Sequence, residues 1–131
     1  MEEIRIRSSK HFEFIDVTRD IQDIVRKNEI KEGICYLYVP HTTAAITINE
    51  NADPAVKNDI ISTFAKIVPW NGNYTHLEGN SAAHVLSTVV GVSVVIPISG
   101  SKLALGRWQG IYFCEFDGPR TRRLIVSIMG E

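Results

Sequence analysis

The sequence predicts an α+β fold: one domain over residues 1–131, with mostly antiparallel sheet and about three helices. The composition, 44% hydrophobic and 22% charged residues, is typical of an ordinary globular domain. The length of 131 residues suits a single domain with a substantial core. The expected elements follow the order ββαββαα and then three strands, which does not alternate as a doubly wound α/β sheet requires.

The N-terminal segment predicts two strands that form a hairpin. In EIRIRSS and in HFEFID, apolar residues alternate with charged or polar ones. This period of two is typical of strands with one buried face and one wet face. We expect residues 8–10 to make the turn between them.

A first helix is predicted to begin with Thr18 as its N-cap and to end at Gly33, because Ile21, Ile24 and Val25 recur at helical spacing. The next segment, GICYLYV, predicts a buried strand because it is short, apolar and rich in residues that favour strands. After PHTT, the segment AITIN predicts a strand with one apolar face and one polar face.

The pair Asp53-Pro54 predicts the start of a second helix, since aspartate is a good N-cap and proline suits the first helical position. Pro69 ends this helix, and the turn-rich loop WNGNYTH follows. The segment SAAHVLSTVV predicts a third helix, closed by Gly91. Its predicted buried face consists of Ala82, Val85, Leu86, Val89 and Val90.

The C-terminal part predicts three strands, VSVVIPI, WQGIYFCEF and RTRRLIVSIM. We expect the last two to form a hairpin across residues 117–120. Cys35 and Cys114 lie inside apolar runs, where free cysteine usually behaves as a small buried hydrophobe. A disulfide between them is the alternative.

The charge balance argues against two classes of partner. Lys and Arg number 14 against 15 Asp and Glu, so no basic field attracts nucleic acid or anionic lipid. The N-terminus is charged, and no stretch approaches the roughly 18 apolar residues of a membrane span. We therefore expect a cytoplasmic protein with neither nucleic acid nor membrane as partner.

Three histidines are candidate metal ligands. His76 and His84 lie in HLEGNSAAH, and a helical wheel places His84 opposite the predicted core stripe. His41 follows a buried strand, where loops commonly carry functional side chains. Catalytic zinc-type sites take three protein ligands and leave one position open. The alternative is ordinary surface or core histidines, because the spacing is unlike the tight HExxH pair; His11 is predicted to be a surface residue.

Several other polar residues are candidates for substrate chemistry. Glu78 could act as general acid or base. Asn80 and Ser81 are N-cap candidates at a helix N-terminus, which can hold an anion. In NENADP, capping explains the aspartate but leaves Asn49 and Glu50, which could orient a polar substrate.

The segment GSKLALGRWQGIYFCEFDGPRTRR contains a third polar cluster. Gln109 and Asp117 are predicted to share a strand face. Arg120 follows a tight turn, where it could pair with Asp117 or bind a phosphate or carboxylate. For Arg122 we expect only a weak cross-strand ion pair with Glu115. Glycine-rich nucleotide fingerprints, GxSxG elbows and CxxC pairs do not occur.

Three segments together resemble the signatures of the YjbQ-like family, whose members are often labelled secondary thiamine-phosphate synthase: HTTAA with NENADP, HLEGNSAAH, and GSKLALGRWQGIYFCEFDGPRTR. The resemblance runs from about Val39 to the C-terminus. It implies a compact α+β domain that assembles as a homotrimer with sites near subunit boundaries. It also implies that the three histidines gather around one pocket and hold a divalent metal, zinc. The implied neighbours of this pocket are Glu78, Asn80, Gln109, Asp117 and Arg120.

Two functional hypotheses follow. The first is a metal-dependent enzyme for a small phosphorylated or anionic metabolite, with Glu78, Asp117 and Arg120 in catalytic roles. Its substrate-binding residues would be Asn49, Glu50, Asn80, Ser81 and Gln109. Joining an aminopyrimidine methyl diphosphate to a thiazole phosphate, as the family label implies, is expected to be a weak side activity, because three histidines suit zinc whereas diphosphate enzymes usually hold magnesium through oxygens. The second hypothesis is a non-catalytic trimeric module that binds a small anion or a metal.

Overall fold

The computed structural model describes residues 1–131 as two antiparallel sheets and three helices. The strands are β1 (Glu2–Arg7), β2 (Glu13–Asp16), β3 (Glu32–Tyr38), β4 (Ala44–Glu50), β5 (Ser93–Ser99), β6 (Lys102–Leu103), β7 (Gln109–Glu115) and β8 (Thr121–Gly130). The helices are α1 (Thr18–Lys27), α2 (Pro54–Ile67) and α3 (Ser81–Val90). The predicted α+β class is confirmed, and the short strand β6 is an addition to the predicted elements.

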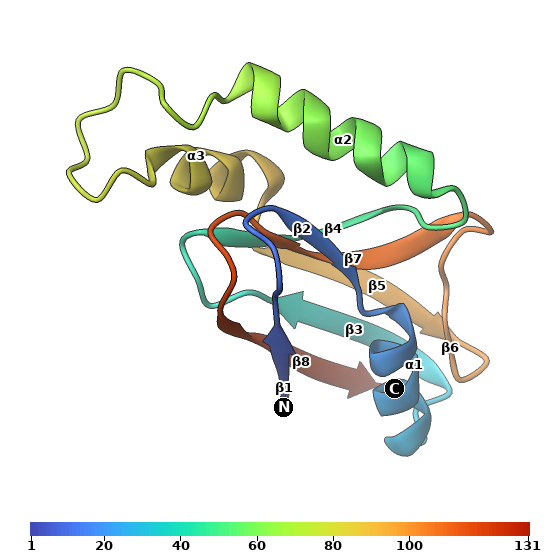
Figure 1. Cartoon of the computed structure of the whole chain (residues 1–131). Helices are drawn as coiled ribbons and strands as arrows, with labels where there is room; N and C mark the ends of the chain where they lie inside the picture. Colours follow the sequence, from blue (N-terminus) through green and yellow to red (C-terminus); the bar gives the residue numbers. More distant parts are fainter.

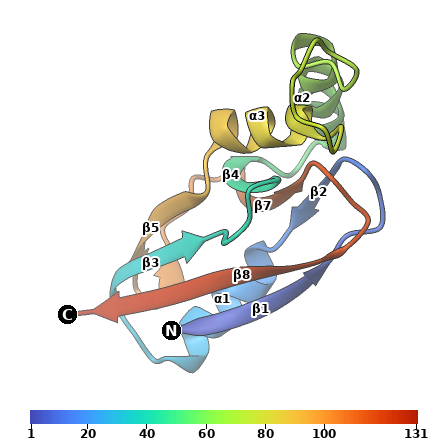
Figure 2. The same cartoon turned by 90° about the vertical axis from the view of Figure 1, so that its left-hand side faces the viewer.

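The elements are arranged in layers (Figures 1 and 2). Helices α2 and α3 lie over the smaller sheet, β2-β7-β4, and the larger sheet, β1-β8-β3-β5-β6, lies on its other side. The main core fills the space between the sheets and includes Ile21 and Val25 of α1. A second core, with Phe14 and Leu86, lies between the smaller sheet and the two helices.

The two cysteines are free and buried, as predicted. Cys35 belongs to the main core and Cys114 to the second core.

Both predicted hairpins are wrong. β1 pairs with β8 in the larger sheet, whereas β2 pairs with β7 in the smaller one. The segment between β1 and β2 therefore crosses from one sheet to the other, and so does the segment between β7 and β8. Alternating residues show which face of a strand is buried, but they do not show which strand lies beside it.

The two crossings lie against each other and are joined by hydrogen bonds. The Ser8 backbone N–H donates to the Arg120 carbonyl oxygen at 3.0 Å, and Ser8 Oγ donates to Glu115 at 2.8 Å. A Cβ atom at Gly118 would lie 2.3 Å from the Lys10 carbonyl oxygen, so the approach of the two crossings requires glycine there.

Helix α1 differs from its prediction at both ends. Val17 occupies the N-cap position, and the hydroxyl of Thr18 accepts a hydrogen bond from the Ile111 backbone N–H at 2.8 Å. The helix ends well before Gly33, which lies inside β3. A Cβ atom at Gly33 would lie 2.1 Å from the Met129 carbonyl oxygen, so this glycine allows close strand packing and does not end a helix.

Helix α2 begins as predicted. Asp53 accepts a hydrogen bond from the Ala55 backbone N–H at 2.9 Å, and Pro54 is the first helical residue. Its apolar stripe is only partly covered, since Phe64 packs on the second core but Ile67 is 63% exposed. None of the three helices is long and apolar enough to cross a bilayer.

Helix α3 has the predicted limits, but its buried face is rotated from the predicted one. Val85 and Val89, predicted to be buried, are 39% and 62% exposed. Ser87, which is not part of the predicted buried face, is buried and donates a hydrogen bond to the Ala44 carbonyl oxygen at 2.7 Å. The small side chain of Ala83 allows α3 to approach β4 closely enough for this bond.

Candidate functional site

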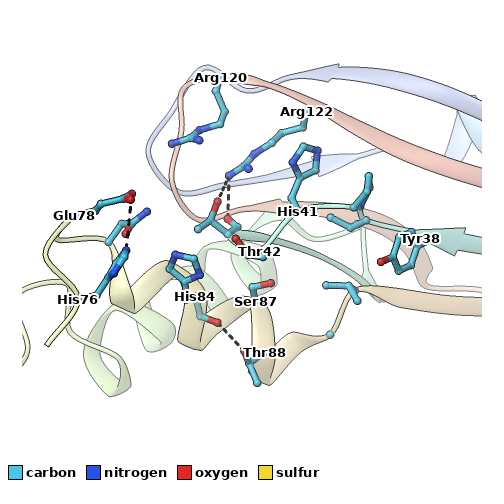
Figure 3. Close-up of a pocket in the computed structure, with 16 residues that line it drawn as sticks. Tyr38, His41, Thr42, His76, Glu78, His84, Ser87, Thr88, Arg120 and Arg122 are labelled. Carbon is cyan, nitrogen blue, oxygen red and sulfur yellow. Dashed lines mark hydrogen bonds and ion pairs between the residues drawn. The ribbon is translucent and has the colours of Figure 1, made fainter. Parts of the chain in front are cut away.

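A largely polar cavity of about 1090 Å³ opens between the end of β3, one face of α3 and the turn from β7 to β8 (Figure 3). The structure brings the three predicted histidines to this cavity together with other predicted residues. Those that line it are His41, His76, Glu78, Asn80, His84 and Arg120.

The remaining predicted site residues lie elsewhere. Glu50 pairs with Gln109 at the far end of β4 and β7, about 20 Å along the strands from the cavity. Asn49 lines a separate, smaller cavity beneath α2. Ser81 and Asp117 are not among the residues that line the cavity. Asp117 does contact two lining residues, Asn80 and Arg120.

His76 and His84 form a pair. Their ring centroids are 5.5 Å apart, and the ring planes are nearly perpendicular. His76 comes from the loop before α3, and Glu78 from the same loop places a carboxylate oxygen 3.9 Å from His76 Nε2. The two imidazoles are therefore close enough to reach one bound ion, with a carboxylate beside them.

His41 has a structural role as well as a place at the cavity. Its Nε2 accepts a hydrogen bond from the Arg123 backbone N–H at 2.9 Å. The backbone pairing of β3 with β8 ends at Tyr38 and Ile125, so the Arg123 N–H has no β3 carbonyl opposite it. The His41 imidazole takes the place of that carbonyl as the acceptor. Burial, followed by the charges of Arg122 and Arg123, lowers the pKa of His41 below its ordinary value of 6.5. The ring is therefore neutral at pH 7.

These positions decide how well the residues fit the zinc that the family resemblance implies. His76 and His84 suit two ligand positions, but no three His, Cys, Asp or Glu side chains form a ready ligand cluster. His41 can add a third ligand only through Nδ1, because its Nε2 is engaged. The His76–His84 pair therefore fits a divalent metal, but no third protein ligand stands beside the pair in this arrangement.

Arg120 and Asn80 are both held by Asp117. Arg120 donates from Nε to the Asp117 carbonyl oxygen at 2.8 Å and from Nη2 to Oδ2 at 3.0 Å. Asn80 Nδ2 donates to the same Oδ2 at 2.9 Å. Asn80 stands at the N-cap of α3, but its side chain makes no capping hydrogen bond. Its Oδ1 is buried without a partner, so a donor from a ligand or water would satisfy it.

The ion pair of Arg122 with Glu115 is not the weak cross-strand pair that the sequence predicts. The side chains are 3% and 0% exposed. Arg122 Nε donates to Glu115 at 2.9 Å, and Nη2 donates to Thr43 Oγ1 at 2.8 Å. Burial would raise the pKa of Glu115, but hydrogen bonds from Arg122, the Asp117 backbone and Ser8 bring it below its ordinary value. Glu115 is therefore ionised.

Arg122 lines the cavity but was not predicted as a site residue. The sequence did contain a signal for its burial. Arg122, Leu124 and Val126 lie at every second position of β8, and the latter two are buried. Because every second side chain of a strand points to the same face, Arg122 belongs on the inner face as well.

Comparison with known proteins identifies the family. The family model described as UPF0047 protein YjbQ-like matches residues 2–131. The chain belongs to the YjbQ-like UPF0047 family. It is 52% identical over 127 residues to a UPF0047 protein of Methanocaldococcus jannaschii, covering 97% of this chain and 92% of the relative. It is 48% identical to the UPF0047 protein YugU of Bacillus subtilis, covering 97% of each chain.

Solved structures of YjbQ-like proteins share the fold. A crystal structure of an uncharacterised YjbQ/UPF0047 protein from Clostridium acetobutylicum superimposes with a TM-score of 0.97 at 46% identity, covering 98% of this chain and 100% of the other. A YjbQ-like structure from Sulfolobus solfataricus gives a TM-score of 0.95 at 35% identity, covering 99% and 96%.

In this YjbQ-like chain the cavity has two contrasting sides (Figure 3). Arg120 and Arg122, from the β7–β8 turn and β8, form what we call the arginine wall. His76, Glu78 and His84, from the loop before α3 and from α3 itself, form the histidine wall. A ligand in the cavity would have guanidinium donors on one side and imidazole nitrogens on the other.

Proposed function

We propose that the chain is a metal-dependent enzyme that acts on a small phosphorylated or anionic metabolite. One observation carries the proposal: the arginine wall and the histidine wall line the same cavity. Guanidinium groups suit phosphate and carboxylate oxygens, and paired imidazoles suit a divalent ion such as zinc.

The charges around the cavity support binding of an anion together with a metal. Arg120 is paired with Asp117, and Arg122 is paired with Glu115. Glu78 adds a further carboxylate on the opposite wall. The two guanidinium groups and these three carboxylates therefore leave no surplus of positive charge to attract an anion. A divalent ion on the histidine wall would supply that surplus.

The residues have distinct roles in this proposal. His76 and His84, with Nδ1 of His41, would hold the metal, which supplies a Lewis acid for a ligand oxygen or a bound water. Arg120, positioned by Asp117, would bind the anionic group. Glu78 stands next to the histidine pair, where it could accept or release a proton.

Thiamine-phosphate synthesis is included in the proposal as a weak side activity. In that reaction the bond from the pyrimidine methylene carbon to the diphosphate oxygen breaks, the thiazole nitrogen bonds to that carbon, and pyrophosphate leaves with the electron pair. The arginine wall would stabilise the departing pyrophosphate. Incubating purified protein with both substrates and separating the products by liquid chromatography tests this; we expect slow formation of thiamine phosphate, and its absence would remove the side activity only.

Metal analysis of purified protein, loaded with zinc and then desalted, tests the main proposal. We expect about one zinc per chain in the wild type and strong loss in His84→Ala, because the variant lacks one of two adjacent ligands. His11→Ala is the matched control, since His11 is half-exposed and outside the cavity lining. Equal zinc content in wild type and His84→Ala would contradict the metal assignment.

The non-catalytic module remains the second candidate, favoured by the fact that no three His, Cys, Asp or Glu side chains form a ready ligand cluster for a metal. It would bind an anion without metal. Thermal unfolding of chelator-treated protein with and without inorganic phosphate distinguishes the two. A rise in Tm without zinc supports the module, and a rise only with zinc supports the enzyme.

A further inference from the structure

We infer that Arg122 is a second anion contact of the cavity and that it binds, together with Arg120, one phosphate group of the ligand. This inference rests on the proposed function and narrows its substrate class to phosphate esters. The sequence predicts only a weak cross-strand ion pair for Arg122, and the family resemblance gives it no ligand. The proposal above places Arg122 in the arginine wall without assigning it a contact of its own.

The hydrogen bonds of Arg122 leave one nitrogen for a ligand. Nε and Nη2 donate to the Glu115 carboxylate, and Nη2 also donates to the hydroxyl and carbonyl oxygens of Thr43. Nη1 makes no hydrogen bond within the chain. The one buried side-chain polar atom without a partner is Oδ1 of Asn80, so Nη1 is not sealed inside the protein. Since Arg122 lines the cavity, Nη1 opens into it.

Arg120 offers a matching donor. Its Nε and Nη2 are taken up by Asp117, which again leaves Nη1. Figure 3 shows the guanidinium groups of Arg120 and Arg122 on the same side of the cavity, and both residues line it. A terminal phosphate has three acceptor oxygens and a charge near −2, so it can accept from both arginines and still present an oxygen to the histidine wall. A carboxylate has a charge of only −1 and two oxygens, so it would have to share one oxygen between two of these three partners.

The surroundings of Arg122 fix its direction. Glu115 is fully buried and ionised, and Thr43 is nearly buried. A guanidinium held at two of its nitrogens offers the third without losing further side-chain freedom, and this preorganisation favours binding. A lysine would keep the charge but would lack the planar fork that allows these contacts together.

Calorimetric titration of the zinc-loaded protein with inorganic phosphate tests the inference. We expect Arg122→Lys to bind phosphate roughly 10- to 100-fold more weakly than wild type, as for loss of one charge-assisted hydrogen bond, while its zinc content is unchanged. Arg123→Lys is the matched control, because Arg123 is adjacent, exposed and outside the cavity lining. It should bind phosphate like the wild type.

Unchanged phosphate affinity in folded Arg122→Lys would overturn the inference and leave the proposed function standing. Absence of phosphate binding by the zinc-loaded wild type would also overturn the inference, whereas the proposed function fails if the metal analysis above finds equal zinc content in wild type and His84→Ala.

If Arg122→Lys fails to fold, NMR of the wild type replaces it. The buried Nε–H signal of Arg122 should shift during phosphate titration while the side-chain signal of Arg123 stays in place. An unmoved Arg122 signal at saturating phosphate would reject the contact.

Discussion

At the scale of single residues, the site depends on polar groups that serve the fold and the cavity at once. His41 completes the edge of β8 through Arg123 while its ring lines the cavity. Asp117 holds both Arg120 and Asn80. A substitution at such a residue changes stability as well as ligand binding, so both must be measured.

The lowered pKa of His41 predicts a pH dependence of stability. Because its pKa in the folded chain is below the ordinary 6.5, the unfolded chain takes up the proton first as the pH falls. The contribution of His41 is thus complete above pH 6.5 and is lost as the pH falls through the lower folded pKa. In metal-free protein, denaturant unfolding from pH 8 to pH 5 should show a steeper loss for wild type than for His41→Asn. Parallel curves would contradict the assignment of this titration to His41.

Ser8 is predicted to be important for stability despite its small size. Ser8→Ala removes the buried donor to Glu115 and the acceptor of the Arg120 backbone N–H at 2.9 Å. We expect the free energy of unfolding to fall by about 1–3 kcal/mol, because buried polar groups lose partners. Ser9→Ala, at an exposed neighbouring position, should change it by less than about 0.5 kcal/mol. Similar values for both variants in urea unfolding would count against this role of the crossing.

At the scale of elements, strands and helices formed largely where the pattern predicted them, but their partners did not follow from it. Consecutive strands β1 and β2 belong to different sheets, and so do β7 and β8. These crossings bring the Glu115–Arg122 pair beside the PHTT loop that holds His41 and Thr43. Two simple hairpins would not have joined the arginine wall to the histidine wall.

The cap of α2 gives a prediction at this scale. Asp53→Ala should lower the free energy of unfolding by about 1 kcal/mol, because the Ala55 backbone N–H loses its acceptor. Asp53→Ser keeps a capping oxygen and should stay close to wild type. Equal losses in the two variants, measured by denaturant unfolding, would mean that the carboxylate acts by charge and not as a cap.

At the scale of the whole molecule, the larger sheet has an outer face that is apolar and open. Ile34, Tyr38, Val95 and Met129 on this face are 37%, 39%, 53% and 53% exposed. Helices α2 and α3 lie on the far side of the smaller sheet and do not cover it (Figure 2). Tyr38 also lines the cavity. Copies of the chain that associate through this face would therefore meet beside the candidate site. The family resemblance implies such an arrangement, a homotrimer with sites near subunit boundaries.

Assembly through this face can be tested directly. Val95→Glu places a charge at its centre and should shift the sedimentation equilibrium from trimer to monomer, because an unpaired charge cannot be buried cheaply at an interface. Val95→Thr keeps the shape of the side chain and should remain trimeric. A trimer that persists in Val95→Glu would place the contact on another surface, and a monomeric wild type would contradict the trimer itself.

The sequence by itself determined the class of fold, most element limits, the cap of α2 and the candidate site residues that follow β3, that lie before and in α3, and that lie in the β7–β8 turn. These features depend on local chemistry, namely the periodicity of apolar residues, capping side chains and the special backbone of proline and glycine. The signatures around His41, His76 and Arg120 were visible for the same reason, since each is a short continuous segment.

Only the tertiary structure decided which strands are neighbours, which face of α3 is buried, and that Arg122 belongs to the cavity while Asn49 and Gln109 do not. Each of these depends on contacts between residues far apart in the chain, such as Ser87 with Ala44 and Arg122 with Thr43. A local pattern records that a group needs a partner, but packing in three dimensions decides which partner it finds.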